Sequence, residues 1–158
     1  SFLNEPDILI LDEPFSGLDP INAQIFKDAI SEFVKEGRLV IFSSHQMGYV
    51  EEVCDDVTLI HNGDILLSGN LDEIKRAEGK DKLFLSVLSD GEVWKEDLQS
   101  AFPALIILPG DEGLILDTQG QVSQGDILGW LAGQNLVIRQ FGLYEPSLND
   151  IFIQKAGD

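Results

Sequence analysis

The chain has 158 residues, of which 44 % are hydrophobic, and a formal net charge of −18. This length allows one ordinary domain or two small ones. Both halves are acidic and neither has a basic patch, so we expect no direct binding of nucleic acid or anionic lipid. No apolar run approaches the ~20 residues of a membrane helix, so no direct membrane insertion is expected. Cys54 is the single cysteine, which excludes a disulfide within the chain.

The first predicted strand, residues 7–11, follows a helix end expected at residues 1–4. Its run Ile-Leu-Ile-Leu is typical of a strand buried on both faces, as in a parallel sheet. Asp12 and Glu13 follow directly, and a tight turn closed by Gly17 and Asp19 comes next. Ligands of open α/β sheets bind beyond the carboxyl ends of strands, so residues 12–19 are a candidate site.

A helix over about 20–36 and a strand over 39–42 come next. Pro20 is suited to a first helical turn and Gly37 to the position after the last turn. A strand, a crossover helix and a second strand form a right-handed βαβ unit with parallel strands. This geometry predicts that Asp12, Glu13 and the segment 43–45 meet at one edge of the sheet.

Residues 46–54 predict a short helix, and 56–61 and 64–68 two strands. Asn62-Gly63 between these strands is a strong hairpin signal, and we interpret His61 beside it as structural. A helix over 70–78 begins with Asn70 and Glu73 at the spacing of a capping box. The polar residues 79–82 then predict a boundary between domains at 1–79 and 80–158.

The second domain has no histidine, cysteine or phosphate-binding loop, which favours regulation or subunit contact over catalysis. Its elements follow the order βαββαβ before a last helix, which is typical of a small α+β, ferredoxin-like fold. The expected strands are 83–88, 105–108, 114–117 and 136–141, and the expected helices are 93–102, 123–133 and 147–155.

The first domain carries the residues that hydrolysis of a nucleotide γ-phosphate would need. Such a site requires a carboxylate for Mg²⁺ or its water shell, a group that orients or deprotonates the attacking water, and a donor to the phosphate oxygens. Asp12 is the candidate for the metal, Glu13 for the water and His45 for the γ-phosphate. Taken singly, Asp-Glu-Pro is more often a polar turn and a strand-end histidine more often structural. A stand-alone Mg²⁺-dependent hydrolase using Asp12 and Glu13 is a further, weaker interpretation.

These motifs together resemble the ATPases of ABC transporters, over about residues 1–78. Residues 8–19 are similar to the family's Walker B strand, catalytic glutamate and D-loop, and His45 to its switch histidine. The resemblance implies the C-terminal half of a P-loop NTPase parallel-sheet domain. It also implies a D-loop that faces the ATP interface and crosses to a second copy of the subunit, made of Ser16, Gly17, Leu18 and Asp19. Residues 145–152 resemble the close of family members that serve exporters and have a short C-terminal domain.

The phosphate-binding sequence Gly-x-x-x-x-Gly-Lys-Ser/Thr and the family's Leu-Ser-Gly-Gly-Gln stretch do not occur in the chain. We therefore expect the C-terminal portion of an ATP-binding subunit, inactive by itself. The whole protein would bind and hydrolyse Mg-ATP to drive export through transmembrane permease subunits, at the cytoplasmic face of the cell membrane. The alternative is a non-catalytic regulatory or dimerisation module.

Overall fold

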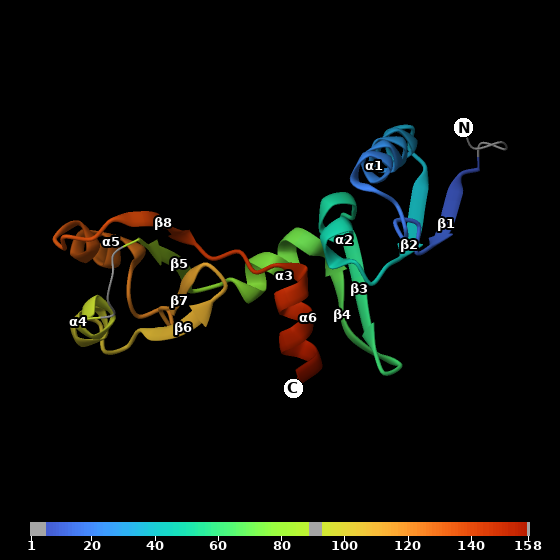
Figure 1. Ribbon diagram of the computed structural model, residues 1–158. Coiled ribbons are helices and arrows are strands. Elements are labelled where there is room, and N and C mark those ends of the chain that lie inside the picture. Colours follow the sequence, from blue (N-terminus) through green and yellow to red (C-terminus); the bar gives the residue numbers. More distant parts are fainter. Residues whose placement is uncertain (1–5, 89–92, 158) are drawn as a thin grey trace. The chain divides into compact units, whose positions relative to one another are not determined.

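The computed structural model describes residues 6–88 and 93–157, so the helix end expected at 1–4 lies outside the described residues. The fold is mixed α/β, with one small parallel sheet and two antiparallel sheets (Figure 1). The elements form two compact units: unit 1 holds the chain up to Ile74 and again from Ser147, and unit 2 holds Lys75–Pro146. The elements in chain order are β1 (Ile8–Asp12), α1 (Pro20–Lys35), β2 (Leu39–Ser43), α2 (Met47–Val53), β3 (Asp56–His61), β4 (Asp64–Asn70), α3 (Leu71–Glu78), β5 (Lys82–Val87), α4 (Val93–Ala101), β6 (Ile106–Gly110), β7 (Gly113–Asp117), α5 (Gln124–Ala132), β8 (Ile138–Leu143) and α6 (Leu148–Gly157).

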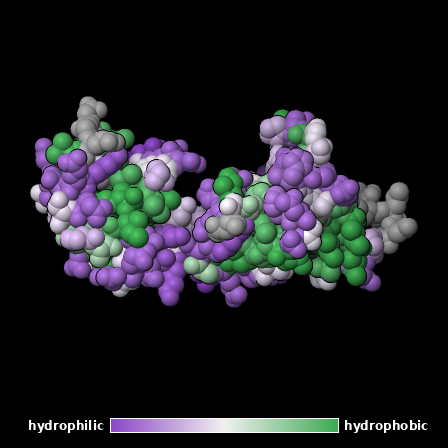
Figure 2. All heavy atoms as spheres, turned by 90° about the horizontal axis from the view of Figure 1, so that it is seen from below, coloured by the Kyte–Doolittle hydropathy of each residue, from purple (hydrophilic) through white to green (hydrophobic). Residues whose placement is uncertain are grey.

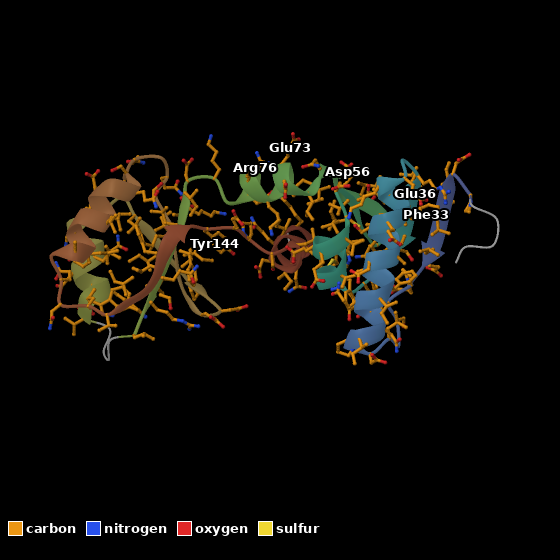
Figure 3. The ribbon with its side chains drawn as sticks, turned by 90° about the horizontal axis from the view of Figure 1, so that it is seen from above. Phe33, Glu36, Asp56, Glu73, Arg76 and Tyr144 are labelled. Carbon is orange, nitrogen blue, oxygen red and sulfur yellow. The ribbon has the colours of Figure 1, made fainter. Side chains whose placement is uncertain are left out.

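In unit 1, β1 and β2 are parallel neighbours joined through α1, as the βαβ pattern predicts. Their register runs from Ile8 opposite Leu39 to Asp12 opposite Ser43. The helix ends where expected, because Gly37 takes a φ of 83° and donates its N–H to the Val34 carbonyl at 2.9 Å. The guanidinium of Arg38 lies 4.9 Å from the ring centre of Phe33, which is labelled on α1 in Figure 3.

The prediction that the first strand is buried on both faces is wrong for this chain. Residues alternate along β1 and β2, so that one face packs against α1 while Ile8, Ile10, Leu39 and Ile41 stay exposed on the other. Ile10 is 74 % exposed. Large hydrophobic side chains thus reach the surface, and Figure 2 shows hydrophobic patches in green between hydrophilic residues in purple.

The hairpin of β3 and β4 forms around Asn62-Gly63, which confirms the turn prediction. Both turn residues have positive φ, 51° and 91°, as this type of two-residue turn requires. The N-cap half of the predicted capping box is confirmed, since the N–H of Glu73, labelled in Figure 3, donates to Oδ1 of Asn70 at 3.2 Å. His61 contacts the ring of Phe152 edge-on at 5.7 Å between ring centres, in keeping with a structural role.

The core beside this hairpin also holds a partly buried cysteine. Cys54 follows α2 directly and packs against this core. Burial, with a smaller contribution from the charge of Asp55, raises the pKa of its thiol to about 11. The thiol is therefore protonated at neutral pH and behaves as an apolar group.

Unit 2 is a four-stranded antiparallel sheet in the order β6-β7-β5-β8, with α4 and α5 on the same side of it (Figure 1). Its elements occur in the predicted order. The core lies between the helices and one face of the sheet, and its buried members are Leu83, Leu85, Leu98, Leu105, Leu116, Ile127 and Leu131.

The structure divides the chain differently from the predicted domains 1–79 and 80–158. The last helix, α6, belongs to unit 1, because Leu148 packs with Val57, Leu59 and Leu71 of the hairpin and α3. Leu148 is fully buried and Ile151 nearly so. An amphipathic helix packs wherever an apolar surface is open to it, and order along the chain does not specify that surface.

We predict that Leu148→Ala destabilises unit 1 and leaves unit 2 unchanged. Truncating a buried leucine costs about 2–5 kcal/mol. Both tryptophans of the sequence, Trp94 and Trp130, lie in unit 2, so their fluorescence reports its unfolding while circular dichroism reports both units. Urea should therefore melt part of the dichroism signal earlier, at an unchanged fluorescence midpoint.

Leu131→Ala is the matched control, because Leu131 is buried in the core of unit 2. This substitution should move the fluorescence midpoint. A fluorescence shift in Leu148→Ala as large as that in Leu131→Ala would contradict the placement of α6 in unit 1.

Candidate functional site

The end of β1 is joined to the end of β2 by the side chain of Ser43. Its Oγ donates to Oδ1 of Asp12, the residue directly opposite in the register. The N–H of Glu13 donates to both the carbonyl and the Oγ of Ser43, at 3.1 and 3.2 Å. Ser43 thus holds the carboxylate of one acidic residue and the backbone of the next.

Glu13 has a left-handed backbone conformation, with a φ of 46°. Residues other than glycine adopt this region rarely, and such strain is concentrated at functional sites. The conformation breaks the alternation of the strand just after Asp12. The Glu13 side chain therefore lies beside the segment that follows β2.

His45 contacts this side chain twice. Its ring Nδ1 lies 2.7 Å from Oε1 of Glu13, and its backbone N–H donates to the same oxygen at 3.1 Å. The other oxygen of Glu13, Oε2, is buried and has no hydrogen-bond partner. The imidazole is 74 % exposed, so the pair has one side held by protein and one side open to a ligand.

Phe15 fixes the loop that follows. It is 1 % exposed, stacks on the ring of Tyr49 at 4.5 Å between centres, and meets Phe26 and Phe42 edge-on at 5.4 and 5.6 Å. Such aromatic contacts add to the free energy of burial. The loop is therefore anchored to α1, β2 and α2 one residue beyond Pro14, and Glu13 keeps its position relative to His45.

The residues predicted as a D-loop form an exposed turn that ends in a helix cap. Gly17 takes a φ of 73°, and Oδ1 of Asp19 accepts hydrogen bonds from the N–H groups of Ile21 and Asn22, each at 3.0 Å. These bonds, the backbone bond from Asn22 first, lower the pKa of the Asp19 carboxyl. Ser16, Gly17 and Leu18 are exposed to solvent.

The structure thus brings Asp12, Glu13 and His45 together at one edge of the sheet, and the turn from Ser16 to Asp19 follows them. Sequence reasoning placed Ser43 at this edge within the segment 43–45 but gave it no role, and it missed Phe15. The contact between Ser43 and Asp12 depends on the register of β1 and β2, and no local sequence pattern specifies that register. Phe15 could have been found as the one aromatic residue in a polar turn.

A metal ion at this edge would need ligands from outside the protein. In the described parts of the chain, no group of three or more His, Cys, Asp or Glu side chains could hold a metal ion. Mg²⁺ commonly keeps several waters and binds through one or two carboxylates plus substrate phosphates. The single carboxylate of Asp12 fits a magnesium ion that arrives with a phosphorylated ligand.

Comparison with known proteins identifies the family. Residues 69–156 match the family model described as "ATP-binding protein DrrA1-3-like, C-terminal domain", which covers more than half of the chain. The chain belongs to the ATP-binding proteins of ABC transporters, and the predicted resemblance is confirmed. Within that family it carries the DrrA-like C-terminal domain.

Several curated relatives are similar along most of the chain. The uncharacterized ABC transporter ATP-binding protein YhaQ of Bacillus subtilis is 39 % identical over 98 % of this chain and 50 % of its own length. An uncharacterized ABC transporter ATP-binding protein of Alkalihalophilus pseudofirmus is 37 % identical over 99 % of this chain and 57 % of its own length. A fluoroquinolones export ATP-binding protein of Mycobacterium tuberculosis is 36 % identical over 58 % of this chain and 30 % of its own length. The chain thus spans about half the length of the first two relatives.

None of the helices in the described residues combines the length and the hydropathy that a membrane crossing requires.

The cap at Asp19 leads to a pH prediction. Because the pKa of its carboxyl is lowered below the ordinary 3.8, the cap is fully formed above that value and is lost as the pH falls through the folded-state pKa. A carboxyl NMR titration of Asp19 should show a midpoint below 3.8. Asn22→Ala should raise the midpoint, because it removes the side-chain donor that lies 2.6 Å from Oδ2. A midpoint at or above the ordinary value would contradict this account of the cap.

Proposed function

We propose that this chain is the C-terminal portion of an ATP-binding subunit whose whole protein binds and hydrolyses Mg-ATP to drive an ABC transporter. The arrangement of Asp12, Glu13 and His45 at one sheet edge carries this proposal, and membership of the family supports it. Unit 1 would be the C-terminal half of a P-loop NTPase domain, and the order and pairing of strands in unit 2 support a ferredoxin-like fold.

Glu13 would orient the attacking water and take its proton. Its Oε1 is occupied by His45, whereas Oε2 is buried and unpartnered. A buried carboxylate oxygen without a donor is costly, and a water molecule can satisfy it. The bonds to Oε1 fix the carboxylate plane, so a water on Oε2 would be held in one direction.

His45 would place a donor at the γ-phosphate. Its Nδ1 is directed to Glu13, which leaves Nε2 on the exposed side of the ring. Donation from Nδ1 to Glu13 and from Nε2 to a phosphate oxygen together require the imidazolium form. Charge that develops on the phosphate oxygens would be stabilised by this donor.

Asp12 would hold the magnesium ion of Mg-ATP through a water molecule. The bound ion offsets the negative charge of the phosphates. The hydrogen bond from Ser43 fixes one oxygen of Asp12 and so sets the direction of the carboxylate.

The partners in this proposal are ATP, a second copy of the subunit contacted by the turn from Ser16 to Asp19, and transmembrane permease subunits at the cytoplasmic face of the membrane. Export is the proposed direction, since one relative is named as an export protein.

Replacing Glu13 tests this function directly. In the whole protein, Glu13→Gln should lower kcat by about 10²–10⁴-fold, the usual contribution of a general base, and leave ATP affinity nearly unchanged. Glu32→Gln, an exposed substitution on α1, is the matched control and should leave both values unchanged. Steady-state hydrolysis and ATP titration calorimetry give the two values. Full turnover in Glu13→Gln would show that this residue has no role in the mechanism. In a separate assay, Mg-ATP hydrolysis by the 158-residue chain alone would contradict its expected inactivity.

Ser43 should act as a positioning residue for the carboxylate of Asp12 and the backbone of Glu13. Hydrogen bonds to charged groups contribute about 1.5–3 kcal/mol, so Ser43→Ala should lower kcat of the whole protein roughly 10–100-fold. Ser43→Thr keeps the hydroxyl and should restore most of the rate. The Mg²⁺ concentration at half-maximal rate should rise in Ser43→Ala alone, which a general loss of stability would not cause. Equal rates in the alanine and threonine variants would contradict the role of the hydroxyl.

A further inference from the structure

The sheet of unit 2 has one face that α4 and α5 do not cover. Leu83, Leu85 and Leu116 point to the helices, so the residues that alternate with them share the other face. The pairing of the strands arranges this open face in rows across β6, β7, β5 and β8. The rows are Ile106, Asp117, Lys82 and Tyr144; then Leu108, Ile115, Phe84 and Gly142; then Gly110, Gly113, Ser86 and Gln140.

The first two rows of this open face combine apolar side chains with one pair of opposite charges, whereas Ser86 in the third row is buried and donates its Oγ to the Glu112 carbonyl at 2.8 Å. Ile106 and Leu108 are 46 % and 40 % exposed. The charged side chains in the rows are Lys82 and Asp117, which stand opposite each other in the register and cancel. The whole chain has a net charge of −18, so contact between two copies at this neutral face adds less local repulsion than contact at an acidic surface.

We propose that the open face binds the open face of a second copy of this chain. The two-fold axis would run parallel to the strands, between β5 and β7. It would place β5 on the partner's β7 and β6 over the partner's β8. Each row would then lie over the same row of the partner. Two sheets pack in this aligned way at about 10 Å, with a moderate angle between their strands.

The rows are complementary to themselves under this symmetry. Lys82 faces the partner's Asp117, and the reverse contact repeats it. In the central row Phe84 meets the partner's Ile115, and Leu108 lies over the partner's Gly142. A Cβ atom built on Gly142 would meet nothing within 4 Å, so this glycine leaves open space where a protruding leucine would lie. A Cβ atom on Gly113 would come within 2.9 Å of the Phe84 ring, so that ring already fills the space above Gly113.

The area of the face sets the expected affinity. Four strands about 4.8 Å apart and about five residues long, at ~3.4 Å per residue, present roughly 300 Å² in projection. With side-chain relief on both copies the buried surface would be on the order of 1,000 Å², at the lower end for specific complexes. We therefore expect a weak, concentration-dependent dimer, which gains strength where another contact already holds two copies together.

Sedimentation equilibrium of the 158-residue chain over a wide concentration range tests the proposal. The average mass should rise towards that of a dimer. Leu108→Lys places an unpaired charge over the partner's Gly142 and should leave a monomer at every concentration. The controls are Leu128→Lys and Ile10→Lys, which should dimerise like the unchanged chain. Leu128 is exposed on α5, and Ile10 is exposed on β1 of unit 1.

A mixing experiment tests the symmetry itself. Lys82→Asp and Asp117→Lys should each self-associate more weakly than the unchanged chain, because each homodimer repeats a like-charge contact twice. Their equimolar mixture restores both opposite-charge contacts and should associate more tightly than either variant alone. Circular dichroism of each variant confirms the fold, since Oδ1 of Asp117 also accepts the N–H of Gln119.

Several results would overturn the proposal. One is a chain that stays monomeric at every concentration, and another is a Leu108→Lys variant that still self-associates. The others are loss of the dimer in Ile10→Lys alone, and a mixture of the two charge variants that associates no more tightly than either variant by itself. None of these results bears on ATP hydrolysis, so this proposal and the proposed function fail separately.

Discussion

The candidate site depends on the position of one residue, Glu13, in a backbone conformation that a non-glycine residue rarely adopts. Three contacts hold it there. Ser43 accepts its N–H, Phe15 anchors the following loop in an aromatic cluster, and the ring and backbone of His45 bind its carboxylate. These contacts come from β2, from its following turn and from α1 and α2, so the carboxylate is fixed by packing beyond its own segment. Contacts of this kind place Glu13 before any ligand arrives, and such preorganisation is what electrostatic stabilisation of a transition state would require in the proposed function.

Much of the architecture could be predicted because the chain marks its elements with local signals. Asn62-Gly63 specified the hairpin, Gly37 the end of α1, and Asn70 with Glu73 the start of α3. The meeting of Asp12, Glu13 and His45 followed from a general rule, since a right-handed βαβ unit brings the ends of both strands to one edge. The order of elements in unit 2 was equally readable, because its apolar runs alternate between short strands and amphipathic helices.

The features that could not be predicted depend on pairing between distant segments. The role of Ser43 requires the register of β1 and β2, and the left-handed Glu13 is a backbone state that no residue type announces. Ile8 and Ile10 are both exposed, and predicting this requires knowledge of which face of the strand other elements cover. The place of α6 is of the same kind: its apolar side, with Leu148 and Ile151, suits either unit, and only the assembled hairpin shows where it packs.

The return of α6 makes unit 2 an insertion within unit 1 rather than an appendage at its end. Leu71 at the start of α3 and Leu148 at the start of α6 belong to one buried cluster, so the chain leaves and re-enters the same core. A segment attached at two neighbouring points can be replaced as a whole, by evolution or by design. Unit 1 would keep its packing if unit 2 were replaced in this way. Loss of the packing of α6, by contrast, removes part of the core of unit 1 and leaves unit 2 whole. A substitution that displaces α6 is therefore expected to affect unit 1, although α6 follows unit 2 in the sequence.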